Sequence, residues 1–154
     1  MSGTVVIGVG NPYRGDDGAG REAARVVRQH VAGELDVVVC ELEPTRLIDA
    51  WDGADAALVV DAVASGGEPG TVHRFDATAE ALPSREFRSS THALGIGETI
   101  ELARAIGRLP GRIVVFGIEG ETFGSGTELS VGAQSGVGRA VELVLEEAGC
   151  TIRP

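Results

Sequence analysis

Residues 5–20 read VVIGVGNPYRGDDGAG, and this stretch decides the fold. A β-branched apolar run leads into a Gly-Val-Gly-Asn turn, and two adjacent aspartates then precede apolar residues at helical spacing. The pattern predicts a first strand over Thr4–Val9, a tight loop, and a first helix from Ala19 to about Val31. A nearly continuous apolar run is typical of a strand buried on both faces of a parallel sheet.

The same stretch partly matches a dinucleotide-binding fingerprint, Gly-x-Gly-x-x-Gly. That fingerprint needs a third glycine at position 13, where the chain has Tyr13, and the expected helix starts too late to cradle a phosphate. Asp16 and Asp17 would also repel a pyrophosphate from the N-terminus of the helix. A nucleotide-handling α/β enzyme therefore stays open only as an alternative.

Strands and helices alternate along the rest of the chain. Strands are predicted over 36–42, 56–60, 70–75 and 112–118, and helices over 44–51, 91–108 and 131–148. Pro44 is expected to open the first of these helices and Ser130 to cap the last. Polar residues in the strand over 70–75 indicate an edge strand, with His73 at the surface. The alternation predicts a single domain over residues 1–154 with a three-layer α/β/α architecture and a twisted, mostly parallel five-stranded sheet.

Composition narrows the class of protein. The 154-residue chain is 43% hydrophobic and has a formal net charge of −10, which argues against nucleic acid or an anionic membrane as a partner. No apolar run approaches the ~18 residues that a membrane span needs, and the N-terminus does not resemble a signal peptide. Cys40 and Cys150 do not stand in a metal-ligand spacing. We expect a cytoplasmic, monomeric protein.

Three residues are candidates for a site at one edge of the sheet. Asp17 precedes the first helix, Asp61 follows the most apolar predicted strand, and His92 lies at the start of the helix predicted from residue 91. Parallel strands with right-handed crossovers bring the carboxyl ends of the first and third strands to the same edge, so these side chains can converge. Each also has a simpler interpretation, as a helix cap, a loop-stabilising aspartate or a surface histidine. Asp16 is predicted to be the cap of the first helix.

Two carboxylates and one imidazole suit a divalent first-row metal with open coordination positions, or metal-assisted hydrolysis. Other hydrolytic arrangements are not found in the sequence. It contains no His-Glu-x-x-His motif, no Gly-x-Ser-x-Gly nucleophile turn and no Asp-Thr-Gly loops of an aspartic protease.

The chain resembles the hydrogenase maturation endopeptidases. Residues 8–20, GVGNPYRGDDGAG, are similar to the opening motif GxGNxxxxDDGxG of that family. Three shorter segments resemble its central acidic motif, its histidine motif and its C-terminal pattern: VVDAV at 59–63, THALG at 91–95 and GIEG at 117–120. The matches follow the family's order over nearly the whole chain.

The resemblance implies an endopeptidase that removes a C-terminal extension from the nickel-loaded precursor of the nickel-iron hydrogenase large subunit. The family's metal-contacting residues correspond to Asp17, Asp61 and His92, which become the expected catalytic and metal-binding residues. The nickel is expected to belong to the substrate, although another divalent metal such as zinc can use the same ligands. The resemblance also implies that Asn11 orders the loop and that Gly10 and Gly18 allow close backbone approach. A non-catalytic nickel checkpoint or chaperone protein with the same ligands is a further alternative.

Two departures from the family pattern bear on this expectation. Many members have a glycine-containing turn after the second strand, whereas residues 41–46 here read ELEPTR, which can alter recognition of the substrate tail. Asp17 stands where some relatives have glutamate, and its side chain is one methylene shorter, which changes the reach to a metal.

Overall fold

The structure is a computed structural model that describes residues 3–31, 33, 35–83 and 95–150. Its five strands form one sheet in the order β2-β1-β3-β5-β4. The strands are β1 (Thr4–Val9), β2 (Asp36–Cys40), β3 (Ala56–Val63), β4 (Val72–Asp76) and β5 (Arg112–Glu119). All neighbours are parallel except β4, which pairs antiparallel with β5 at one edge. The predicted mostly parallel five-stranded sheet and the edge position of the fourth strand are confirmed.

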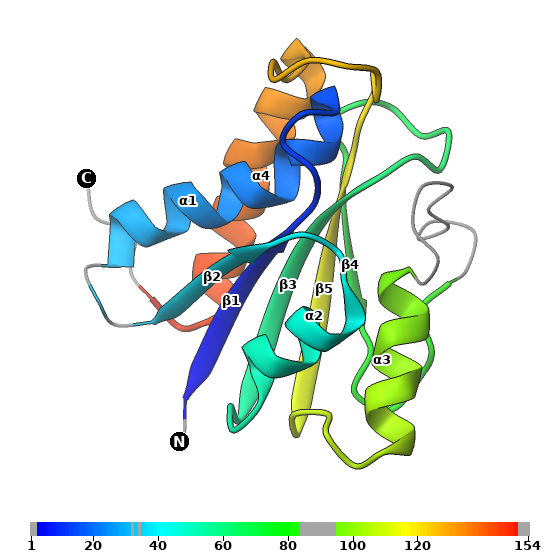
Figure 1. The fold of residues 1–154 in the computed structure, drawn as a ribbon. Helices are drawn as coiled ribbons and strands as arrows, with labels where there is room; N and C mark the ends of the chain where they lie inside the picture. The colour runs from blue at the N-terminus through cyan, green and yellow to red at the C-terminus, as the bar shows by residue number, and fades with distance from the viewer. Residues whose placement is uncertain (1–2, 32, 34, 84–94, 151–154) are drawn as a thin grey trace.

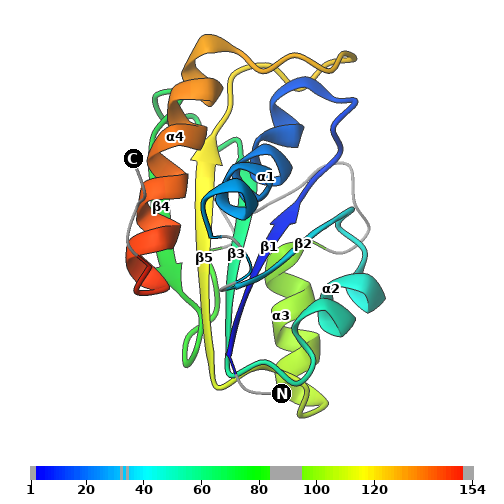
Figure 2. The ribbon, with the colours of Figure 1, turned by 90° about the vertical axis from the view of Figure 1, so that its left-hand side faces the viewer.

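Helices cover both faces of the sheet, which confirms the three-layer architecture (Figures 1 and 2). One face carries α1 (Ala19–Val31) and α4 (Val131–Glu147), and the other carries α2 (Pro44–Trp51) and α3 (Ile96–Ala105). A short 3-10 helix, η1 (Gly15–Gly18), connects the turn after β1 to α1. None of the helices in the described residues has both the length and the apolar character that crossing a lipid bilayer requires.

The helix boundaries follow from local chemistry. Glu43 caps α2 by accepting hydrogen bonds from the N–H groups of Thr45 and Arg46, and a proline opens the helix. The hydroxyl of Ser130 caps α4 by accepting a hydrogen bond from the N–H of Ala133, as the sequence predicts. The helices pack on the sheet through two apolar clusters, one on each face.

The bounds of β2, β4, β5 and α4 differ from the prediction by one or two residues, and β3 and α3 differ by more. Strand β3 does not stop before Asp61 but continues to Val63, because its pairing with β5 extends to the end of that strand. Helix α3 begins at Ile96, since Gly95 before it has an extended backbone, and it ends at Ala105 rather than near residue 108. The left-handed backbone of Gly107 (φ +74°) explains the early end. The predicted beginning at residue 91 lies outside the described residues.

Candidate active site

The turn after β1 is organised by Asn11. Its side-chain oxygen accepts a hydrogen bond from the N–H of Tyr13 at 2.9 Å, and its carbonyl accepts one from the N–H of Arg14 at 3.2 Å. Its own N–H donates to Oδ2 of Asp17 at 2.9 Å. The same residue therefore shapes the loop and fixes the carboxylate of Asp17, which confirms that Asn11 orders this loop.

The motif glycines let backbone segments approach too closely for any side chain. A Cβ on Gly10, whose φ is +141°, would lie 2.0 Å from the carbonyl oxygen of Asp17. A Cβ on Gly18 would lie 3.1 Å from Cα of Pro12, which is tighter than an ordinary contact. A Cβ on Gly20 would lie 2.3 Å from the carbonyl oxygen of Val60. The glycines thus press η1 and the start of α1 against β1 and β3, next to Asp61.

We expect Gly10→Ala to lower the free energy of unfolding by at least about 2 kcal/mol, because alanine strains the backbone and collides with the carbonyl of Asp17. Gly124→Ala is the matched control, since a Cβ there meets nothing within 4 Å and the backbone is not left-handed. Its expected change is within about 0.5 kcal/mol. Urea denaturation of both variants tests this expectation, and equal stability of the two would contradict the close approach at Gly10.

Asp61 is a buried carboxyl group within β3. Its side chain lies on the strand that pairs with β5, opposite Gly117, and the residue is only 8% exposed. Burial, together with the negative charge of Asp17, raises the pKa of Asp61 to about 8, although a 2.8 Å hydrogen bond from the N–H of Ala62 to Oδ1 acts in the opposite direction. Among the residues that the structure describes, no cationic side chain compensates the charge of Asp61.

Asp17 and Asp61 come together as the sequence predicts. Asp17 is half-buried on η1, and its charge acts directly on Asp61 across the carboxyl end of the sheet. Two carboxylates that repel each other in a partly buried site favour binding of a divalent cation, because its positive charge attracts both of them. The oxygen ligands also fit a first-row metal.

The third predicted ligand, His92, lies outside the described residues. Within the described part of the chain, no group of three His, Cys, Asp or Glu side chains is arranged to hold a metal ion. Asp17 and Asp61 therefore make up two of the three predicted ligands, and the expected role of His92 stays a prediction.

Asp16 does not cap α1, contrary to the expectation from the sequence. It is fully buried within η1, and its carboxylate accepts hydrogen bonds from the N–H groups of Glu121, Thr122 and Ser130 and from the Ser130 hydroxyl, at 2.7–3.1 Å. Burial alone would raise the pKa of Asp16, but these hydrogen bonds outweigh it and lower the pKa below its usual value. Asp16 thus ties the motif to the loop between β5 and α4.

A second buried carboxylate, Glu119, was not identified from the sequence as a site residue. It is 1% exposed at the end of β5, and its Oε1 accepts a hydrogen bond from the Ser65 hydroxyl and lies 3.1 Å from Nε2 of His73. His73 is therefore half-buried and paired, rather than a simple surface histidine as predicted. Glu119 lies opposite Val63 and two residues beyond Gly117, so it shares a sheet face with Asp61. The alternation of side-chain directions along β5 is the sequence signal that could have identified Glu119.

Comparison with known proteins identifies the family to which the chain belongs. The family model of hydrogenase maturation proteases, HycI, matches residues 27–147. The chain is 28% identical to the hydrogenase expression/formation protein HupD of Thiocapsa roseopersicina over 147 residues, which is 92% of this chain and 66% of that protein. It is also 28% identical to HupD of Bradyrhizobium diazoefficiens over 119 residues, or 75% of this chain and 61% of that one. The chain thus spans slightly less than two thirds of the length of these curated relatives.

Solved structures agree with the sequence comparison. The [NiFe] hydrogenase maturation protease HycI of Thermococcus kodakarensis superposes with a TM-score of 0.73 at 25% identity, covering 96% of this chain and 92% of that one. The hydrogenase maturating endopeptidase HybD of E. coli has the same fold, with a TM-score of 0.76 at 19% identity and coverage of 96% and 94%. With the GxGNxxxxDDGxG motif and the Asp17–Asp61 pair in place, the chain belongs to the hydrogenase maturation protease family.

Proposed function

We propose that this protein is an endopeptidase that removes the C-terminal extension of a nickel-loaded hydrogenase large-subunit precursor. The observation that carries the proposal is the Asp17–Asp61 pair at the carboxyl end of the sheet, in which Asp17 belongs to the opening motif and Asp61 to the central acidic segment. Membership of the maturation protease family supports the type of reaction and the type of substrate. The proposed setting is the cytoplasm, with the protein acting as a monomer.

In this proposal nickel is part of the substrate, and the protein recognises it. Asp17 and Asp61 supply carboxylate oxygens to the nickel of the precursor, with His92 as the proposed third ligand. Asp61 is nearly neutral around pH 7 in the metal-free protein because its pKa is about 8, so it gives up its proton when the precursor brings a cation into the site. A site with few ligands and a proton to displace binds a free metal weakly, which suits a protein that inspects a metal and releases it. Zinc or another divalent ion would meet the same oxygen ligands.

The metal would also assist hydrolysis of the peptide bond. A divalent cation next to the scissile bond polarises its carbonyl or lowers the pKa of an attacking water. In this mechanism the protein holds Asp17 in place through the N–H of Asn11 and keeps Asp61 largely shielded from solvent. Glu119, which contacts Ser65 and His73, lies on the same sheet face as Asp61.

The test is incubation of the purified protein with a purified nickel-loaded large-subunit precursor, followed by intact mass measurement. The expected result is one cut that yields the shortened large subunit and its C-terminal fragment. Binding of the precursor without any cut would contradict the endopeptidase proposal and favour a nickel checkpoint protein. Binding of a nucleotide in place of the precursor would favour the α/β enzyme alternative.

A further inference from the structure

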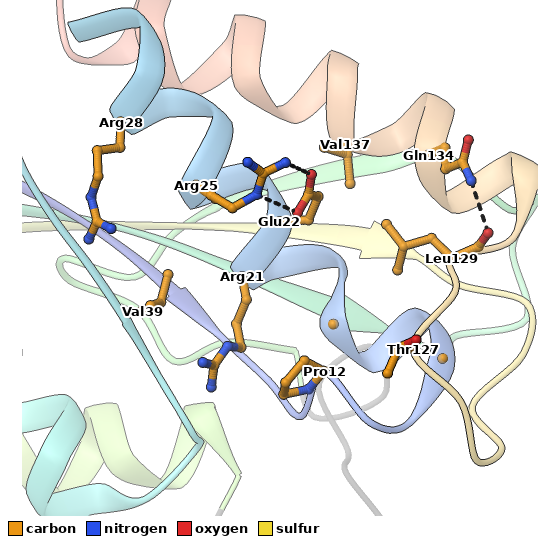
Figure 3. A pocket seen from close by; sticks show the side chains of 12 residues that line it. Pro12, Arg21, Glu22, Arg25, Arg28, Val39, Thr127, Leu129, Gln134 and Val137 are labelled. Atoms are coloured by element: carbon orange, nitrogen blue, oxygen red, sulfur yellow. Dashed lines mark hydrogen bonds and ion pairs between the residues drawn. The ribbon is translucent and has the colours of Figure 1, made fainter. Parts of the chain in front are cut away.

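A groove of about 610 Å³ runs beside α1 (Figure 3). One end is formed by Gly15 and Gly18, the residues of η1 on either side of Asp16 and Asp17. Leu129 and Val137, from the loop before α4 and from α4 itself, add apolar surface to its wall. The groove therefore starts at the turn that positions the proposed site and extends along the first helix.

Cationic side chains are the other main feature of this groove. Arg21, Arg25 and Arg28 line it, and Glu22 is the only carboxylate among the described residues that line it. Glu22 is already occupied, since both of its oxygens accept hydrogen bonds from the guanidinium of Arg25 (Figure 3). The groove thus contains a larger positive charge than its one carboxylate balances.

Arg21 and Arg28 keep their charge uncompensated within the described part of the chain. Arg21 donates a hydrogen bond to the carbonyl oxygen of Gly10 at 3.4 Å, and Arg28 donates one to the carbonyl oxygen of Val37 at 2.7 Å. A carbonyl oxygen orients a guanidinium but does not neutralise it, so both side chains can still bind an anion. This local positive charge stands out on a chain with 13 basic and 23 acidic residues.

We propose that this groove docks an acidic, extended segment of the hydrogenase precursor, and the inference rests on the proposed function. Arg21 and Arg28 are seven positions apart on α1, which corresponds to about 10 Å along the helix axis. In an extended peptide, side chains two or four residues apart lie on the same side, about 7 or 13 Å from each other, so two such carboxylates can reach both guanidiniums through the flexible arginine side chains. Leu129 and Val137 then accept an apolar side chain of the same segment. The docked segment would hold the precursor next to η1 while the cleaved bond reaches Asp61.

Charge reversal tests the groove directly. Affinity for the nickel-loaded precursor is measured with Arg21→Glu and Arg28→Glu, each in the Asp61→Asn background so that bound precursor is not consumed. Arg139→Glu in that background is the control for a charge reversal elsewhere on the surface, because Arg139 is exposed on α4 and is not among the residues that line the groove. We expect each groove variant to weaken binding about fivefold, and the control to leave it unchanged.

The ionic-strength dependence gives a second readout. The loss caused by Arg21→Glu or Arg28→Glu is expected to shrink at high salt, because exposed charges are screened over a few ångströms there. Equal affinity of the groove variants and the control at low salt would overturn the docking proposal, even if the unmodified protein cleaves the precursor. Conversely, the unmodified protein could fail to cleave the precursor while Arg21→Glu and Arg28→Glu still weaken binding. That result would refute the proposed function and leave the docking proposal supported.

Discussion

Asp61→Asn is expected to lower kcat/KM for the nickel-loaded precursor by more than about 100-fold, because it replaces the carboxylate that would hold the metal next to the cleaved bond with a neutral amide. Asparagine has nearly the same shape, and its side-chain oxygen can still accept the hydrogen bond that the N–H of Ala62 now donates to Asp61. The measurement is precursor cleavage over time, followed by mass, with the melting temperature of each protein recorded in parallel.

The loss of cleavage activity in Asp61→Asn can be distinguished from a loss of stability. The pKa of Asp61 is about 8, so the buried side chain is already mostly neutral in the metal-free protein at pH 7. Removing its charge therefore imposes no electrostatic cost on the folded state, and the stability of the variant is expected to equal or exceed that of the parent. An activity loss without a stability loss would identify Asp61 as a group that acts on the substrate.

Two further substitutions and one control complete this test. Asp17→Asn and His92→Ala are expected to reduce cleavage by a similar factor, since each removes a proposed metal contact. Asp36→Asn is the control, because it makes the same chemical change at an exposed position at the opposite end of the sheet, where β2 begins. Full cleavage by the variants at positions 17, 61 and 92 would refute the proposed site.

Asp16→Ala is expected to have the largest effect on folding, lowering the free energy of unfolding by about 3 kcal/mol or more. The substitution leaves three backbone N–H groups and the Ser130 hydroxyl without their acceptor at a fully buried position. Three of these donors are backbone N–H groups of the loop before α4, which would have to rearrange or take in water to satisfy them. Urea denaturation measures the loss, and Glu142→Ala, which removes only an exposed ion pair, is expected to cost less than about 1 kcal/mol.

The contribution of Asp16 to the free energy of unfolding is expected to decrease as the pH is lowered. Its pKa is lower in the folded protein than in the unfolded chain, so the ionised carboxylate stabilises the fold at neutral pH and that contribution is lost as the pH falls through the folded pKa. The stability difference between the parent and Asp16→Asn should be constant near neutral pH and should shrink below about pH 4. A difference that grows on acidification would contradict the hydrogen-bonded role of Asp16.

Local sequence signals predicted much of the fold. The β-branched run before Gly8 predicted β1 with its observed bounds, Pro44 marked the first residue of α2, and Ser130 marked the cap of α4. The polar residues of the fourth strand identified it as an edge strand. The meeting of Asp17 and Asp61 was predictable because parallel strands direct their carboxyl ends to one edge.

Features that depend on distant contacts were not predictable from local patterns. Asp16 resembles a helix cap in the sequence, yet its partners lie more than 100 positions further along the chain, in the loop before α4. Likewise, His73 and Glu119 are 46 positions apart and meet only because β4 folds back antiparallel against β5. Asp61 was expected after β3, but the pairing with β5 keeps it within the strand.

The central claim is that this protein uses Asp17 and Asp61 to recognise nickel carried by its substrate. The most direct measurement compares cleavage of one precursor preparation with and without nickel, under identical conditions, by intact mass. Cleavage of the nickel-loaded precursor alone is the predicted result, with no cut in the nickel-free form. Equal cleavage of both forms would contradict the claim.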